Sequence, residues 1–250
     1  MATNTSRRPV SDEQILYPYD GFLANRVRVI DGLLKADPYS IDALGLVGMV
    51  MCSLGRYCYP EKWTQRQFRL LLREHCPSFK ERVSIPILLR KLKRDSSHAR
   101  FESDCRQAYP LEQGWLVREA TADPLEADFL RWAAGLGYKA PLELIDRATY
   151  SYLIYVDYRT CIHHELRVGK EHEPFRGLPT EREVYYENEG EEGALPEQYM
   201  FLCVAPDHLL LLLKEAIADL RAWALANRRN LFVNPASKIG VNGSTVSASN

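Results

Sequence analysis

The sequence lacks several patterns by which common classes of functional site are recognised. Its six cysteines include no C-x-x-C pair, which argues against a structural zinc site and gives no compact disulfide framework. We interpret them as buried or reduced thiols. There is no glycine-rich phosphate loop, which counts against a nucleoside triphosphate enzyme, and no internal repeat, which argues against a solenoid. We expect neither a metal ion nor a cofactor.

The chain also lacks an excess of charge of either sign and a long apolar run. Its formal net charge is -1, so any nucleic-acid binding needs a local basic patch. The most apolar segment, residues 43–54, is shorter than the roughly 20 residues that span a bilayer, and we interpret it as a buried core helix. No apolar stretch follows Met1, so we expect no secretory signal, no membrane association and a cytoplasmic location.

What the chain does contain is a series of amphipathic patterns that predict a mainly α fold. With 250 residues, 46% of them hydrophobic, it is long enough for one sizeable domain or two small ones. One long helix is predicted to begin at Pro141 and to reach His163. Two short strands, over residues 184–186 and 199–204, are expected to form a small β-hairpin-like insertion. The other predicted helices cover residues 22–34, 40–57, 62–75, 85–94, 124–134 and 206–227.

The predicted organisation has two helical parts between two tails. Residues 1–10 and 234–250 are polar and small, and we expect both to be flexible. Between them we predict an N-terminal helical region over residues 11–123 and a C-terminal helical domain over residues 124–233. The insertion in the second part covers residues 170–204.

One pair of residues carries most of the chemistry that the sequence suggests. Arg159 precedes His164 in an Arg-x4-His pattern near the end of the helix predicted from Pro141. A guanidinium stays positive at cellular pH and binds phosphate through two parallel hydrogen bonds, whereas an imidazole takes or gives a proton near neutrality. Such a pair can cleave RNA without a metal ion.

Two other arginine–histidine pairs have comparable spacing, so context decides between them. Arg69 and His75 lie on a helix whose outer face carries further arginines, and we interpret that pair as part of a solvated charged face. Arg167 and His172 lie in a charged, glycine-containing loop, where no rigid element holds them. The pair at Arg159 lies at the tip of an apolar, tyrosine-rich helix, which favours it over the others.

The helical spacing of this pair has a geometric consequence. Positions five apart lie about 140° apart around a regular helix, so Arg159 and His164 do not share a face. We therefore expect either that two copies of the chain bring Arg159 of one next to His164 of the other, or that the last turn unwinds. His163 shares a face with Arg159 and remains an alternative proton-transfer residue.

With these residues, the stretch from about Leu125 to Asn230 resembles the HEPN superfamily. Active members of that family are helical domains that carry Arg-x4-6-His near the end of a core helix, and a polar residue, here Thr160, commonly follows the arginine. The resemblance implies a HEPN-type helical bundle and a metal-independent endoribonuclease. It also implies a homodimer with a shared cleft, a toxin or phage-defence role, and an antitoxin or other regulatory protein as a partner.

RNA cleavage of this kind needs little from the protein, because RNA supplies its own nucleophile. The 2'-hydroxyl attacks the adjacent phosphate and leaves a 2',3'-cyclic phosphate and a 5'-hydroxyl. His164 would transfer protons, which typically contributes ~10² to 10⁴ in rate, while Arg159 would stabilise the developing charge. DNA lacks the nucleophile and would be inert.

The RNA must also be held, and two groups of residues are candidates. The basic cluster consists of Arg90, Lys91, Lys93 and Arg94, although an ordinary exposed helix end would look the same because cations favour helix C-termini. The second group is a pair of aromatic side chains that can stack on bases, or can instead pack in the core or a dimer contact. This pair is Tyr155 and Tyr158.

Two functions without catalysis remain open. In one, the chain is an inactive helical interaction module in which Arg159 pairs with Glu165 or Asp157. In the other, the chain binds a nucleotide or RNA through Arg159 without turnover.

Overall fold

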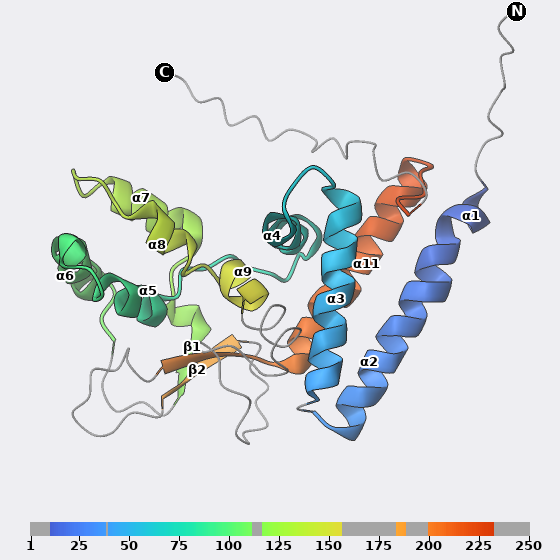
Figure 1. Cartoon of the computed structure of the whole chain (residues 1–250), viewed down its shortest axis with the longest axis horizontal. Coiled ribbons are helices and arrows are strands. Elements are labelled where there is room, and N and C mark those ends of the chain that lie inside the picture. Colours follow the sequence, from blue (N-terminus) through green and yellow to red (C-terminus); the bar gives the residue numbers. More distant parts are fainter. Residues whose placement is uncertain (1–10, 39, 112–116, 157–183, 189–199, 233–250) are drawn as a thin grey trace, which may run out of the picture.

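The computed structural model describes residues 11–38, 40–111, 117–156, 184–188 and 200–232. Helices dominate these residues, so the predicted mainly α class is confirmed (Figure 1). The first elements are α1 (Asp12–Tyr17), the π-helix η1 (Pro18–Leu23), α2 (Ala24–Ala36), α3 (Ile41–Cys58) and α4 (Thr64–His75). They are followed by α5 (Ile85–Leu92), the 3-10 turn η2 (Ser96–His98), α6 (Ala99–Ala108), the 3-10 turn η3 (Ala120–Ala122), α7 (Glu126–Ala134), α8 (Leu142–Asp146), α9 (Tyr150–Leu153) and α11 (Pro206–Ala226).

The first lobe consists of α1, α2, α3, α4 and α11. Figure 1 shows α2, α3 and α11 side by side, and α11 contacts α1, α2, α3 and α4. All five helices contribute to one hydrophobic core, with Ile15, Ile30, Val47, Phe68 and Leu213 among its buried side chains. The last helix therefore packs on the first four, whereas the predicted division at residue 124 stays a prediction.

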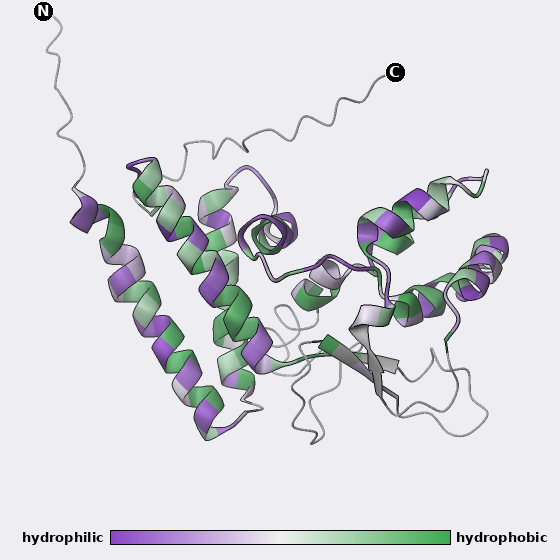
Figure 2. Cartoon of the chain, turned by 180° about the vertical axis from the view of Figure 1, so that it is seen from behind, coloured by the Kyte–Doolittle hydropathy of each residue, from purple (hydrophilic) through white to green (hydrophobic). Residues whose placement is uncertain are grey.

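The helix α3 is the central element of this lobe. By length and composition alone it could cross a membrane, but 56% of that window is buried inside the protein. It packs against α2, α4 and α11, as the predicted buried core helix would. Figure 2 shows hydrophilic residues interspersed with hydrophobic ones along the helices around it, which is typical of amphipathic elements packed on a core.

The helices α3 and α4 approach each other closely at Gly55. A Cβ atom on Gly55 would lie 2.8 Å from the backbone oxygen of Gln67, closer than real contacts allow. The Gln67 side chain fixes the same corner, because its amide donates to the carbonyls of Tyr59 at 3.0 Å and Lys62 at 2.6 Å. Glycine is therefore required at this position by packing.

The second lobe consists of α5, α6, α7 and α8, which Figure 1 shows on the other side of α4 and α9. Its core is a separate cluster of buried side chains that includes Leu88, Leu89 and Leu92 of α5. Aromatic rings fill the space between α6 and α7: Phe101 meets Phe129 edge to face at 6.4 Å, and Phe129 lies 5.1 Å from Trp132.

A three-stranded antiparallel sheet completes the described fold. Its order is β1 (Val117–Glu119), β2 (Val184–Asn188) and β3 (Met200–Val204), and Tyr186 of β2 pairs with Leu202 of β3. The two strands predicted near the insertion are confirmed, and they pair as a hairpin would. The strand β1 was not predicted, because three residues carry too little alternation to be recognised.

The prediction of one continuous helix over residues 141–163 is wrong for residues 141–156, which the structure describes. Residues Leu142–Asp146 and Tyr150–Leu153 form two short helices, and between them Thr149 is extended, with φ -72 and ψ 148. Thr149 forms an antiparallel bridge with Val83, a residue far away in the sequence. Helical periodicity in the sequence does not reveal such a break, because the bridge partner lies elsewhere in the chain.

Candidate nucleic-acid interface

The predicted catalytic motif lies outside the described residues. This applies to Arg159, Thr160, His163 and His164, and to Tyr158. The same holds for Arg167 and His172. The motif therefore stays a prediction from the sequence.

Tyr155 is the predicted base-stacking residue that the structure describes. Its ring is half-buried and packs against the first-lobe core, with its centroid 5.6 Å from that of Phe68 in α4. This packing favours the core contact over a role in stacking on RNA.

The predicted basic cluster is divided by the structure into residues with different surroundings. Lys91 and Arg94 line a pocket with a volume of about 580 Å³, whereas Lys93 is exposed on the same short segment and does not line it. Arg90 is partly buried and also lies outside the pocket lining. Four residues that look equivalent in the sequence are therefore not equivalent in the fold.

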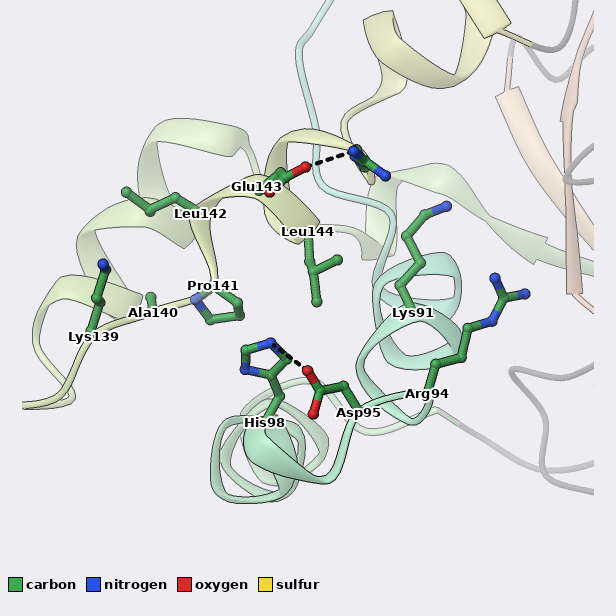
Figure 3. Close-up of a pocket in the computed structure, with 11 residues that line it drawn as sticks. Lys91, Arg94, Asp95, His98, Lys139, Ala140, Pro141, Leu142, Glu143 and Leu144 are labelled. Carbon is green, nitrogen blue, oxygen red and sulfur yellow. Dashed lines mark hydrogen bonds and ion pairs between the residues drawn. The ribbon is translucent and has the colours of Figure 1, made fainter.

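The pocket lies between the end of α5 and the segment that leads into α8, as Figure 3 shows. Residues 139–144 form one wall, and Leu144 points into the space between Pro141 and the helix that carries Lys91. His98 lies below, next to Asp95. The full lining is Lys91, Arg94, Asp95, His98, Lys139, Ala140, Pro141, Leu142, Glu143, Leu144 and Arg147.

The charge of this lining is predominantly positive. Lys91, Arg94, Lys139 and Arg147 contribute four cations, against the two carboxylates of Asp95 and Glu143. Clustered cations of this kind provide a local basic patch in a chain whose net charge is only -1.

Both carboxylates of the pocket already have partners. Glu143 Oε1 accepts a hydrogen bond from Arg147 at 2.6 Å. Asp95 caps η2, accepting from the backbone N–H of Ser97 at 2.9 Å, and lies 3.7 Å from His98 Nε2. The Ser97 hydrogen bonds, backbone first, hold the pKa of Asp95 below its ordinary value, with a smaller contribution from His98. Asp95 is therefore ionised at neutral pH and lies close to the imidazole of His98.

The local sequence explains why these residues line one pocket. Ser84 caps α5 by accepting from the N–H of Ile87 at 3.4 Å, and Pro86 occupies the first turn, where proline is tolerated. The leucines of α5 face the second-lobe core, which leaves Lys91 and Arg94 at the rim. The helices α5 and α8 contact each other, and this contact brings residues 139–147 to the same place.

Sequence reasoning missed three basic side chains of the pocket: His98, Lys139 and Arg147. Each lies in a different segment, and none belongs to a recognisable motif. The available signal was the position of Lys139 just after the glycine turn of residues 135–137 and just before Pro141, because such turns commonly lie at the surface.

The interpretation of Arg69 and His75 as a solvated charged face is wrong. The side chain of Arg69 is only 14% exposed and forms two hydrogen bonds with the Asp146 carboxylate, at 2.9 and 2.6 Å. Arg69 Nε also donates to Ser151 at 3.0 Å. Arg69 therefore joins α4 of the first lobe to α8 and α9, because these elements supply the carboxylate of Asp146 and the hydroxyl of Ser151.

His75 likewise lies in a packed corner. Its Nδ1 donates to Asp219 Oδ2 of α11 at 2.7 Å, and its Nε2 lies 3.0 Å from the hydroxyl of Tyr59. That hydroxyl donates to Glu74 at 2.5 Å, and burial raises the pKa of Tyr59 above its ordinary value. A tyrosine held in its neutral form is a poor nucleophile, so this cluster fits a structural role that joins α3, α4 and α11.

A second polar cluster was also missed by sequence reasoning. The carboxylate of Asp123, 1% exposed, accepts hydrogen bonds from the hydroxyls of Tyr150, at 2.8 Å, and Tyr186. Tyr186 also bonds Ser84 Oγ at 2.7 Å. Burial raises the pKa of both tyrosines well above the ordinary value. The cluster is enclosed in the protein and ties α5, α9 and β2 together.

Comparison of the chain with family models, curated proteins and solved structures found no match. The resemblance to the HEPN superfamily therefore rests on the residues of the sequence alone.

Proposed function

We propose that the chain is an RNA-binding protein that cleaves RNA without a metal ion. The observation that supports this most directly is that Lys91, Arg94, Lys139 and Arg147 all line one pocket, in a chain with a net charge of -1. Phosphate contacts by lysine and arginine supply most of the affinity of proteins for nucleic acids. Cleavage itself rests on Arg159 and His164.

The proposed reaction divides the work between these two residues. His164 removes the proton from the 2'-hydroxyl or protonates the departing 5'-oxygen, with His163 as the alternative. Arg159 stabilises the negative charge that develops on the phosphate. Because the two residues do not share a helical face, the proposal includes a homodimer in which the partner completes the site.

The test is an RNA cleavage assay in EDTA with the wild type, Arg159→Ala and His164→Ala. We expect cleavage by the wild type, and a loss of about 10² or more in rate for each variant. His163→Ala is the matched control, since loss of activity in this variant alone would reassign the proton transfer. Cleavage that requires a divalent cation, or that survives His164→Ala and His163→Ala, would refute the mechanism.

The proposed biological role is that of a toxin or phage-defence effector in the cytoplasm, with an antitoxin or other regulator. Expression of the wild type should then slow cell growth, and His164→Ala should relieve the effect. Harmless expression of the wild type under conditions in which the purified protein cuts RNA would contradict this role.

One observation favours binding without cleavage as the second candidate. The chain that leads to the motif is not a continuous rod, because it is interrupted at Thr149 and residues 154–156 have π-helical geometry. The pocket does not depend on Arg159, so it would bind RNA equally well in an inactive module. RNA binding with no cleavage under any condition would establish this alternative.

A further inference from the structure

The pocket between α5 and α8 combines two chemically different parts. Pro141 and Leu144 provide apolar surface in its interior, and the imidazole of His98 lies beside them (Figure 3). Lys91 and Arg94 lie together on the α5 side. Its volume of about 580 Å³ falls within the ~300 to 1,000 Å³ that is typical of small-molecule sites.

These two parts match the two parts of a nucleotide. Arg94 can bind a phosphate through two parallel hydrogen bonds, and Lys91 adds a second positive charge beside it. A base is planar and largely apolar on its faces, so it can lie on Leu144 and Pro141 and stack on the ring of His98. A long acidic peptide would need cations along its length and has no use for the apolar interior.

We propose that this pocket binds one nucleotide of a single-stranded RNA, with its phosphate at Lys91 and Arg94 and its base on Pro141, Leu144 and His98. That the polymer is RNA rests on the proposed function, and the pocket adds that the bound RNA is single-stranded. A base that is paired inside a duplex cannot reach such an interior, because its faces are covered by its neighbours.

The test measures binding by the 250-residue chain, using calorimetry with four probes. These are 5'-AMP, adenosine, inorganic phosphate and a short single-stranded RNA whose 2'-hydroxyls are methylated, so that it cannot be cleaved. We expect the RNA to bind more tightly than 5'-AMP, and 5'-AMP more tightly than adenosine or phosphate. The same RNA as a duplex should bind more weakly than the single strand.

Arg94→Ala and Lys93→Ala form a matched pair of variants, because both residues are exposed but only Arg94 lines the pocket. Arg94→Ala should weaken binding of 5'-AMP about tenfold or more, whereas Lys93→Ala should change it less than about twofold. Unchanged thermal unfolding of both variants shows that the fold is intact.

Several results would overturn the inference. These are phosphate binding as tightly as 5'-AMP, an oligoglutamate peptide displacing the RNA as well as a nucleotide does, and equal effects of the two variants. No probe is turned over, so an inactive Arg159 and His164 pair would leave these measurements unchanged. A failure of cleavage and a failure of this pocket can therefore be told apart.

Discussion

At the scale of single residues, Asp123 shows how one buried carboxylate joins distant segments. Its Oδ2 accepts from the hydroxyls of Tyr150 and Tyr186, and its Oδ1 accepts from the N–H of Ile85 at 3.3 Å. Local sequence patterns did not reveal this role, because an aspartate before a proline is most simply a turn residue. Its partners come from three separate elements, which local patterns cannot connect.

Replacement of Asp123 by alanine should be strongly destabilising. Each buried donor that loses its acceptor costs about 1–3 kcal/mol, so we expect a loss of at least ~3 kcal/mol in the free energy of unfolding. Asp128→Ala is the control, because Asp128 is exposed on α7, and its effect should stay within ~0.5 kcal/mol. Urea denaturation of both variants gives the comparison, and similar midpoints would contradict the role assigned to Asp123.

The burial of the cysteine thiols leads to a second prediction about single residues. Five cysteines are buried: Cys52, Cys58, Cys76, Cys105 and Cys203. Burial raises the pKa of Cys58 and of Cys105 to about 12, and the thiolate is the reactive form. In a Cys161→Ser variant at pH 8, a thiol reagent should therefore react with these five only after denaturation. Prompt reaction of the folded variant would show that these thiols are accessible to the reagent and contradict the prediction.

At the scale of elements, the sequence predicted most helices because their apolar spacing is a local property. The α4 helix was predicted over residues 62–75 and is found over Thr64–His75, with Phe68, Leu71 and Leu72 buried as expected. The interruption at Thr149 was not predictable in the same way. It coincides with the bridge to Val83, and only the folded chain brings the two residues together.

Two helical glycines provide a prediction about the packing of elements. Gly55→Ala should destabilise the protein, because its Cβ would meet the backbone of Gln67, which cannot move without separating α3 from α4. Gly32→Ala on α2 has open space around its Cβ and should stabilise the helix by about 0.5–1 kcal/mol. Thermal unfolding of both variants tests this, and shifts of the same sign would contradict the packing of α3 on α4.

At the scale of the whole molecule, the sequence predicted basic residues near the end of α5 but not the pocket that selects among them. Lys91 and Lys93 carry the same charge, but positions two apart point to different sides of a helix, and only Lys91 lines the pocket formed where α5 packs against α8. His98, Lys139 and Arg147 come from other segments. A site assembled from separate segments is a property of the tertiary fold, which spacing along one helix cannot show.

The free energy of unfolding should also fall as the pH becomes alkaline. Burial raises the pKa of Cys58 and Cys105 from the ordinary 9.0 to about 12, and raises that of Tyr150 and Tyr186 above 10.0. These groups ionise at lower pH in the unfolded chain than in the folded protein. Their contribution to the free energy of unfolding is therefore complete below pH 9 and is lost as pH rises from 9 towards 12. Urea midpoints should therefore fall between pH 8.5 and pH 10.5, by less in Cys58→Ser. A constant midpoint would contradict the prediction.

If the cations of this pocket hold RNA, the affinity must fall with rising salt concentration through contacts of Lys91 and Arg94 with phosphate. The affinity for a non-cleavable single-stranded RNA would be measured at several salt concentrations for the wild type, Lys93→Ala and the double variant Lys91→Ala with Arg94→Ala. Each lost phosphate contact should reduce the slope of log K against log salt by about 0.7. We predict a clearly smaller slope for the double variant and an unchanged slope for Lys93→Ala. An unchanged slope in the double variant would show that Lys91 and Arg94 do not hold the RNA.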